Sequence, residues 1–311
     1  PSAVWVDPTG RLLVGRDAVH SAVADPAAYE AHPKRCVDDG TVLLGATEFE
    51  VPALFRAVLD RVVETATTVA GPLDEVVITC PAAWGAQRRA VLTAAAPPGT
   101  RLVTEPVAAA HYFTEIAGAA IPVGRSALVY DFGAGTFDAS VLRRTPDGFV
   151  VSATLGRPDS GGLDIDALIV DDLAATTPAD AAWSRLRSPQ SAKDRRARQQ
   201  LWDNVRHAKE LLSRSAATLV HVPLVDVELP LGREELDRLA VPVLERTVET
   251  TREVLALAGV DAGDLAAIFL AGGSSRMPAV VTTLHRAFGI TPTMADQPEL
   301  VVAEGSLRTG P

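Results

Sequence analysis

One nine-residue segment constrains the fold of this chain more than any other part of the sequence. It is an apolar strand ending in a carboxylate, then a glycine-rich turn and a second strand: Tyr130-Asp131-Phe132-Gly133-Ala134-Gly135-Thr136-Phe137-Asp138. A turn of this kind directs successive backbone N–H groups into one concavity, where they bind phosphate oxygens. A plain β-hairpin with glycine in its turn explains the same residues. The segment therefore predicts two adjacent strands and leaves an anion site and a structural turn as alternatives.

The rest of the chain alternates between strand and helix patterns, which is typical of a mixed α/β fold. Apolar runs bounded by turn residues predict strands at residues 3–6, 12–14, 75–80, 102–104, 127–130, 137–142, 149–153 and 267–270. Helices are expected at residues 52–62, 86–95, 201–212, 244–255 and from about 278. The polar stretch 188–200 is interpreted as the solvated start of a helix. Residues 76–84 and 267–277 repeat the order strand, turn, helix, which is expected of two related α/β halves with a cleft between them.

The composition excludes several classes of protein. The 311 residues are enough for two domains, or for one fold built from two halves. No apolar run approaches the roughly 20 residues that span a bilayer, so no membrane span is expected. The net charge of −10 argues against general nucleic-acid binding, which needs a basic surface to neutralise phosphates. A local anion site remains open.

The cysteines indicate the redox environment. Cys36 and Cys80 are far apart in sequence and belong to no CxxC or Cys/His cluster. Neither a disulfide framework nor a structural zinc site is therefore expected, and a reducing cytoplasm is the expected location. No basic-then-apolar signal segment follows Pro1.

A second motif places a carboxylate between a predicted strand and a helix of small residues. It reads Thr104-Glu105-Pro106-Val107-Ala108-Ala109-Ala110. Glu105 either caps the helix, whose N-terminus favours negative charge, or orients an attacking water or a metal-bound water. Both roles stay open on the sequence alone.

A third motif follows the predicted strand at 267–270 and contains Gly272-Gly273-Ser274-Ser275-Arg276. Paired glycines permit close backbone approach to a ligand, and the planar guanidinium of Arg276 can stack on an adenine ring. A strand-to-helix turn with a serine at the helix N-cap is the alternative.

In order and separation, these three motifs resemble the actin-like ATPase superfamily and, within it, the DnaK type of 70-kDa heat-shock chaperone. Further matching segments are Val77–Trp84 with Gln87 and Arg88, Gly161–Asp166, Ala208–Ser213 and Pro298–Gly305. The similarity runs nearly end to end. It implies a two-lobed, mixed α/β actin-like ATPase fold with flanking helices and nucleotide in a central cleft.

The resemblance also implies ligands and residue roles. The ligands are ATP or ADP with Mg²⁺, which Asp131 would hold through water. Thr136 would bind phosphate, and Glu105 would orient the attacking water. Lys34 aligns with a phosphate-facing lysine, with a solvated surface lysine as the alternative. The remaining residues implied to shape the phosphate turn or to hold the adenosine are Gly133, Ala134, Gly135, Lys209, Ser213, Gly272, Gly273, Ser274 and Arg276. Pro81 and Arg88 match the pair that couples nucleotide state to interdomain signalling.

Several departures from the family pattern bear on activity. The family's opening strand with its Asp-Leu-Gly-Thr-Thr phosphate loop has no counterpart in this sequence, and we expect it upstream of Pro1. Ala134 replaces a glycine and would be strained if its φ were positive. Glu210 replaces a base that sandwiches adenine against the residue matching Arg276, which removes a cation–π contact. Residues 1–311 also contain no β-rich peptide-binding domain.

Five parts are expected: a reduced first-lobe cap (1–50), a first-lobe core (51–124), a second-lobe core in two pieces (125–167 and 256–311), and a helical cap (168–255). The sequence predicts an ATP-binding, DnaK-like domain that hydrolyses ATP if the first phosphate loop exists. The alternative is a catalytically inactive, nucleotide-sensing regulatory or scaffold protein. A sugar kinase is a distant third, because its sugar-binding acids have no counterpart. Adenine nucleotide is the expected partner, and the sequence identifies no protein partner.

Overall fold

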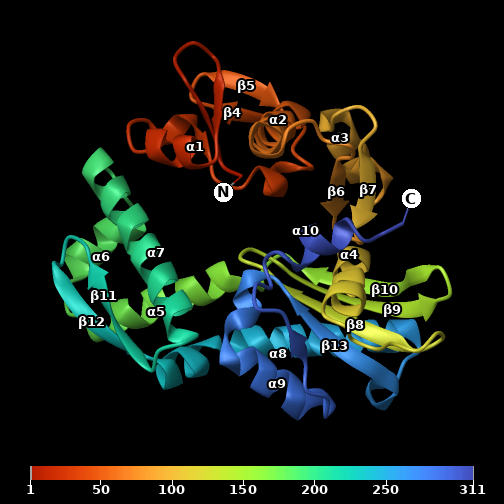
Figure 1. Ribbon diagram of the computed structural model, residues 1–311. Coiled ribbons are helices and arrows are strands. Elements are labelled where there is room, and N and C mark those ends of the chain that lie inside the picture. The colour runs from red at the N-terminus through yellow and green to blue at the C-terminus, as the bar shows by residue number, and fades with distance from the viewer. Residues whose placement is uncertain (1, 311) are drawn as a thin grey trace. The chain divides into compact units, whose positions relative to one another are not determined.

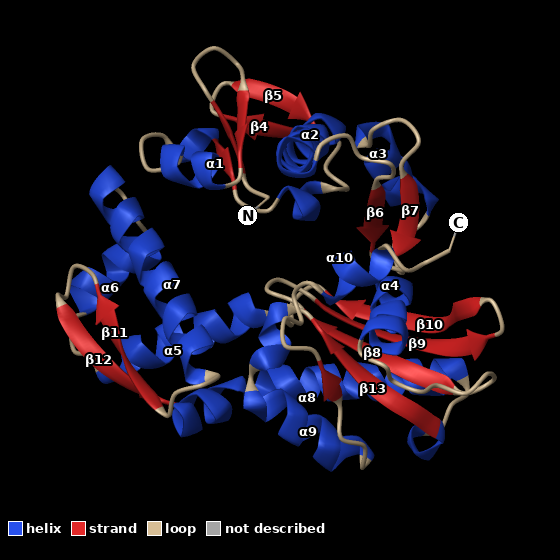
Figure 2. Cartoon of the chain, viewed as in Figure 1, coloured by secondary structure: helices blue, strands red, loops and turns tan. Residues whose placement is uncertain are grey.

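The computed structural model describes residues 2–310, apart from the side chain of Asp180, and they form two compact units (Figure 1). The first unit comprises Pro1–Cys80 and Trp84–Val103, and the second comprises Pro81–Ala83 and Thr104–Pro311. Both units mix helices and strands, as Figure 2 shows. Among the described helices, none is long and apolar enough to cross a membrane.

The first unit is built from small sheets around one long helix. Its strands are β1 (Val4–Val6), β2 (Leu12–Val14), β3 (Tyr29–Glu30), β4 (Thr41–Leu44), β5 (Thr47–Glu50), β6 (Val77–Cys80) and β7 (Arg101–Thr104). They pair in the orders β2-β1-β3, β4-β5 and β6-β7. The helices are α1 (Arg16–Ser21), α2 (Val51–Ala70) and α3 (Ala86–Ala95), with 3-10 turns at Pro26–Ala28 and Pro33–Cys36. Val4, Leu44 and Leu54 form the centre of one core, each at most 1% exposed.

The second unit contains a five-stranded sheet in the order β10-β9-β8-β13-β14. Its strands are β8 (Ser126–Phe132), β9 (Phe137–Thr145), β10 (Gly148–Arg157), β13 (Leu265–Ala271) and β14 (Thr293–Met294). β8, β9 and β10 form an antiparallel meander, whereas β13 runs parallel to both β8 and β14. The central strand β8 is therefore flanked by one antiparallel and one parallel neighbour.

Both faces of β8 are covered, which explains its nearly unbroken apolar sequence. Ala127 and Val129 pack on one face with Phe113, in a cluster that includes residues of α4 (Glu105–His111). Leu128 and Tyr130 point to the opposite face, into the larger core of the unit. Tyr130 is buried there, and its hydroxyl lies 2.6 Å from the Thr247 hydroxyl. Successive side chains of a strand alternate between faces, so one strand supports both cores.

The larger core is completed by helices and one further hairpin. The helices are α5 (Gly162–Thr176), α6 (Asp180–Arg187), α7 (Ala192–Leu212), α8 (Arg233–Ala258), α9 (Pro278–Phe288) and α10 (Val301–Ser306), with 3-10 turns at Ala262–Asp264 and Gly273–Arg276. β11 (Ala217–Val222) pairs antiparallel with β12 (Val227–Gly232). Ser191 caps α7 by accepting a hydrogen bond from the Asp194 N–H.

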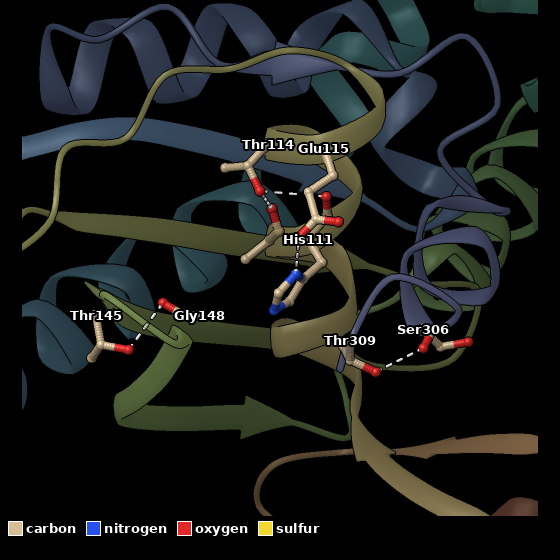
Figure 3. Close-up of polar contacts among 8 residues, drawn as sticks. His111, Thr114, Glu115, Thr145, Gly148, Ser306 and Thr309 are labelled. Atoms are coloured by element: carbon tan, nitrogen blue, oxygen red, sulfur yellow. Dashed lines mark hydrogen bonds and ion pairs between the residues drawn. The ribbon is translucent and has the colours of Figure 1, made fainter. Parts of the chain in front are cut away.

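α4 continues into a π-helix at Tyr112–Ile116. Figure 3 shows the polar contacts around this junction: the His111 Nδ1 lies 2.6 Å from Glu115 Oε1, and the Thr114 hydroxyl donates to the Ala110 carbonyl. In the same view, the Thr309 hydroxyl donates to the Ser306 carbonyl at the end of α10. α10 packs closely on α4, because Gly305 offers no side chain at the contact.

Most of the predicted elements are confirmed. The meander, the strand at 102–104 and the helix at 86–95 appear where the sequence places them, and the predicted helices at 201–212 and 244–255 are parts of the longer α7 and α8. The polar stretch at 188–200 contains the start of α7. The predicted strand at 75–80 begins only at Val77, and the hairpin β11–β12 was not predicted.

The close packing of α10 on α4 leads to a test of stability. A methyl group at Gly305 would overlap the Ala108 carbonyl and approach Tyr112 Cβ to 3.0 Å. We expect Gly305→Ala to lower the free energy of unfolding by about 1–3 kcal/mol, because this overlap outweighs the roughly 1 kcal/mol that alanine gains over glycine within a helix. Urea unfolding followed by circular dichroism measures the change. The control is Gly263→Ala, whose added methyl meets nothing within 4 Å. An equal effect of the two substitutions would contradict the packing argument.

Candidate functional site

The candidate site begins where β8 and β13 end side by side in the second unit. These strands are parallel, and Asp131 is the register partner of Ala271. Gly272 has a φ of +80°, and a Cβ on it would lie 2.5 Å from the Phe132 carbonyl oxygen and 2.6 Å from Asp131 Oδ1. Only glycine adopts this positive φ readily and leaves the space that a Cβ would occupy. The Asp131 and Gly272 motifs are therefore adjacent in the fold.

The turn at residues 133–136 is held by hydrogen bonds from two distant segments. The Gly133 carbonyl accepts one bond from the Gly162 N–H at 3.0 Å and another from the Ser274 hydroxyl at 2.9 Å. The Ala134 carbonyl accepts from the Leu163 N–H at 2.7 Å. Two consecutive carbonyls of the turn thus face the protein.

The N–H groups of the turn are used differently. The Gly133 N–H closes the turn by donating to the Thr136 carbonyl at 3.0 Å. Within residues 2–310, no group accepts a hydrogen bond from the N–H of Ala134 or of Thr136, or from the Thr136 hydroxyl. Ala134 and Thr136 are both exposed. The turn therefore has several donors without an acceptor in the described chain, while the carbonyls of Gly133, Ala134 and Thr136 accept hydrogen bonds from the protein.

Two glycines at the start of α5 allow this turn to approach the helix. A Cβ on Gly161 would lie 2.6 Å from the Gly135 carbonyl carbon and 2.8 Å from the Thr136 nitrogen. A Cβ on Gly162 would overlap the Ser274 hydroxyl and lie 2.9 Å from Lys209 Nζ. The turn at residues 133–136 can therefore lie against α5 only because both residues are glycines. A side chain at either position would displace the turn.

Lys209 supports the same region from α7. Its ammonium donates to the Gly162 carbonyl at 2.6 Å and forms an ion pair with Asp166 Oδ1 at 2.7 Å. The Lys209 side chain is 8% exposed and that of Asp166 is 1% exposed. Burial raises the pKa of the Asp166 carboxyl, and the neighbouring Lys209 ammonium opposes this rise. Within the described chain, Lys209 is thus engaged by protein groups, and its predicted contact with adenosine remains a prediction.

The other residues predicted to hold adenosine lie at the ends of two elements. Ser213 is the C-cap residue of α7, and its hydroxyl donates to the Glu210 carbonyl at 2.7 Å. Glu210 is exposed. Arg276 ends a 3-10 turn after Gly272, and its guanidinium pairs with Glu299 at 2.8 Å. An arginine paired through its edge still exposes its flat face for stacking.

Glu105 and Lys34 fall in different units. Glu105 is half-buried in the first turn of α4, in the same unit as Asp131. Lys34 is exposed in the first unit, with its ammonium 5.8 Å from the centre of the Trp84 ring. Arg88, also in the first unit, pairs with Asp38 at 2.6 Å.

Ala134 is not strained. The non-glycine residues with positive φ in the described chain are Leu224 and Asp226, so Ala134 occupies an ordinary backbone conformation. The substitution of alanine for glycine in this turn therefore keeps the N–H donor without the expected conformational cost.

The structure brings together part of the predicted set and adds supporting residues. Asp131, Gly133, Ala134, Thr136, Gly272 and Ser274 meet around one turn, as the contacts above describe. The supporting residues not selected from the sequence are Gly161, Gly162, Asp164 and Asp166. Asp164 accepts a hydrogen bond from the Gly161 N–H at 2.7 Å and so fixes the start of α5. The available signal in the sequence was a glycine pair with two aspartates in the first turns of an apolar helix.

Comparisons with known proteins find sequences similar to this chain. The family model described as "Hsp70 protein" matches residues 15–309. The chain is 32% identical over 325 aligned residues to the "Chaperone protein DnaK" of each of two strains of Halobacterium salinarum. All of this chain is covered in both alignments, and it spans about half (50%) of the length of these relatives.

The buried ion pair behind the turn leads to a second prediction. In Asp166→Asn the Lys209 ammonium would remain buried without a charged partner, so we expect the free energy of unfolding to fall by about 3–5 kcal/mol. The control is Asp171→Asn on the same helix, since Asp171 is 70% exposed in its pair with Arg187 and such pairs contribute at most about 1 kcal/mol.

Chemical denaturation of the unaltered protein, Asp166→Asn and Asp171→Asn measures the free energy of unfolding of each. The double variant Asp166→Leu/Lys209→Met removes both charges, and we expect it to be more stable than Asp166→Asn. A loss in Asp166→Asn no larger than in Asp171→Asn would show that the ion pair does not hold this part of the fold.

Proposed function

The chain belongs to the Hsp70 family and has that family's mixed α/β, actin-like ATPase fold, and on this premise we propose that it binds ATP or ADP together with Mg²⁺. The observation that carries the proposal is the turn at residues 133–136, where the Gly133 and Ala134 carbonyls accept hydrogen bonds from distant segments while the N–H groups of Ala134 and Thr136 have no acceptor among the described residues. Such a donor set suits an anion with several oxygens.

The phosphates are assigned to this turn on chemical grounds. The N–H groups of Ala134 and Thr136 and the Thr136 hydroxyl are donors, and phosphate oxygens are acceptors. The hydrogen bonds from Gly162 and Ser274 to the Gly133 carbonyl hold the turn, so little conformational entropy would be lost when a phosphate binds. Lys209 acts here as a positioning residue, because its ammonium is bonded to Gly162 and Asp166.

Mg²⁺ is assigned to Asp131. Magnesium prefers oxygen ligands and keeps several of its waters, so one carboxylate and the nucleotide phosphates commonly hold it. Asp131 is half-buried at the carboxyl end of β8, beside Gly272 at the end of the parallel strand β13. Ligands of open α/β sheets commonly bind at the carboxyl ends of parallel strands.

The adenosine is assigned to the residues after β13 and at the end of α7. Gly273 carries no side chain and has open space where a Cβ would project, and Arg276 has a guanidinium for stacking. Ser213 adds a hydroxyl. Glu210 offers no cation at the position where the family has a base, so we expect the adenine to be held less tightly than in relatives with a cation there.

Hydrolysis would use Glu105 to orient a water, and the role of Lys34 toward the phosphates stays a prediction from the sequence. Glu105 lies in the first turn of α4, where the helix N-terminus stabilises its negative charge. The alternative is a member that binds nucleotide and does not hydrolyse it, acting as a regulatory or scaffold protein. Since the chain spans half of its relatives' length, a chaperone activity of the whole protein is likewise a proposal.

Calorimetry of the full-length gene product tests nucleotide binding. With Mg²⁺ present, we expect ADP to bind and Asp131→Asn to weaken binding at least tenfold, whereas with EDTA the two proteins should differ by less than threefold. The matched control is Asp147→Asn in the exposed turn between β9 and β10, which should bind like the unaltered protein. The proposal fails if no heat of binding appears at millimolar ADP, or if Asp131→Asn binds as well as the control.

Single-turnover release of labelled phosphate separates an ATPase from a non-hydrolysing protein. In an ATPase, Glu105→Gln should slow release at least 100-fold while ATP affinity stays within threefold, because an amide cannot accept the proton of the attacking water. The control is Glu115→Gln in the π-helix that follows α4. Release from the unaltered protein at the rate of buffer alone would favour the non-hydrolysing alternative.

A further inference from the structure

The second unit contains a cavity of about 230 Å³ between α5, α6 and α7. Its apolar walls come from Val170 of α5, Leu186 of α6 and Leu201 of α7, and the rings of Trp183 and Trp202 also line it. The nucleotide residues proposed above do not line this cavity. Two indole rings and three aliphatic side chains form a surface suited to a flat or branched apolar group.

One of the residues that line this cavity has a buried polar atom without a partner among the described residues. The Trp183 side chain is buried, since the residue is only 3% exposed, and its indole Nε1 makes no hydrogen bond with any residue in the described range 2–310. Buried N–H groups in native proteins are almost always paired, with protein groups, with water or with a ligand. The indole N–H is only a donor, so its partner must be an acceptor.

The lining of the cavity also includes charged residues. Arg198 is exposed, and within residues 2–310 it makes no hydrogen bond or ion pair. Arg187 also lines the cavity but already pairs with Asp171, its Nη2 lying 3.3 Å from Asp171 Oδ1. The lining therefore has one positive charge in excess, and Arg198 is the cation available to a ligand.

The surrounding sequence strengthens this positive field. Residues 185–200 carry six basic side chains and one acidic side chain, in a chain whose net charge is −10. The six are Arg185, Arg187, Lys193, Arg195, Arg196 and Arg198. The one acid, Asp194, is paired with Arg185 at 2.6 Å. Small anions are attracted to such a patch from solution.

We propose that this cavity binds a small carboxylate with an apolar body, such as an arylalkanoate. The apolar body lies against Trp183, Trp202 and the aliphatic walls, the carboxylate pairs with Arg198, and a carboxylate oxygen accepts the hydrogen bond of the Trp183 indole N–H. A single negative charge matches the single excess positive charge of the lining. A dianion such as a phosphate ester fits less well, because Asp171 also lines the cavity. The site is distinct from the proposed nucleotide site.

Three probes separate the contributions to binding in calorimetry on the full-length protein. 3-Phenylpropionate has both ring and charge, 3-phenylpropionamide has the ring without the charge, and acetate has the charge without the ring. We expect 3-phenylpropionate to bind with a dissociation constant below about 1 mM, at least tenfold more tightly than either comparison compound.

A variant and its control test the role of Arg198. Arg198→Gln removes an exposed side chain that makes no bond within the described chain, so the fold should be retained. It should weaken 3-phenylpropionate at least tenfold and leave the amide unchanged. Arg195→Gln, on the same helix and outside the cavity lining, is the control and should bind like the unaltered protein.

Nuclear magnetic resonance of the indole N–H groups reports on Trp183 directly. The Trp183 signal, assigned by its loss in Trp183→Phe, should move downfield when 3-phenylpropionate is added, because the N–H gains an acceptor. The proposal is overturned if the carboxylate and the amide bind equally, if none of the probes binds at 5 mM, or if the Trp183 signal does not move. Equal binding of the carboxylate and the amide would show that Arg198 does not recognise the charge, and absence of binding would identify the cavity as a packing gap.

Discussion

The carbonyl oxygen of Gly133 joins three distant parts of the second unit. It accepts hydrogen bonds from the Gly162 N–H and from the Ser274 hydroxyl, so that the turn after β8, the start of α5 and the turn after β13 are held together. This junction also explains why residues 161, 162 and 272 are glycines. A Cβ atom at any of the three positions would lie less than 3.0 Å from a neighbouring backbone or side-chain atom. The proposed phosphate donors depend on it as well.

The ion pair of Lys209 with Asp166 is the second support of this region. Two charged groups are buried here, which is favourable only when each has its partner and further hydrogen bonds. Lys209 has both, since it also donates to the Gly162 carbonyl. The end of α7 is thereby connected to the start of α5. Other residues of α5 and α7 line the cavity that Trp183 also lines.

The proposed nucleotide and carboxylate sites use anion recognition in different ways. Around residues 133–136 the donors are backbone N–H groups, whose positions are set by the fold. In the cavity between α5, α6 and α7 the donors are side chains, an indole and a guanidinium, and the walls are apolar. Backbone donors suit a multiply charged phosphate chain, whereas an apolar cavity with one excess positive charge suits a singly charged ligand.

Patterns along the chain predicted most of the secondary-structure elements and the family. Strong local patterns, such as the meander at 126–157 and the helix at 86–95, were predictable because strand alternation, turn glycines and helical spacing are local properties. The three glycine or carboxylate motifs indicated the family because their order along the chain is itself a sequence property.

The packing of distant segments determines which of these residues meet and how each is buried and hydrogen-bonded. Lys209 was predicted to hold adenosine, yet its ammonium is buried against Asp166, a partner 43 positions away that no local pattern identifies. The φ of Ala134 and the unpaired indole of Trp183 also depend on long-range packing. Spacing along a chain specifies secondary structure, whereas burial and hydrogen-bond pairing arise only when distant segments pack together.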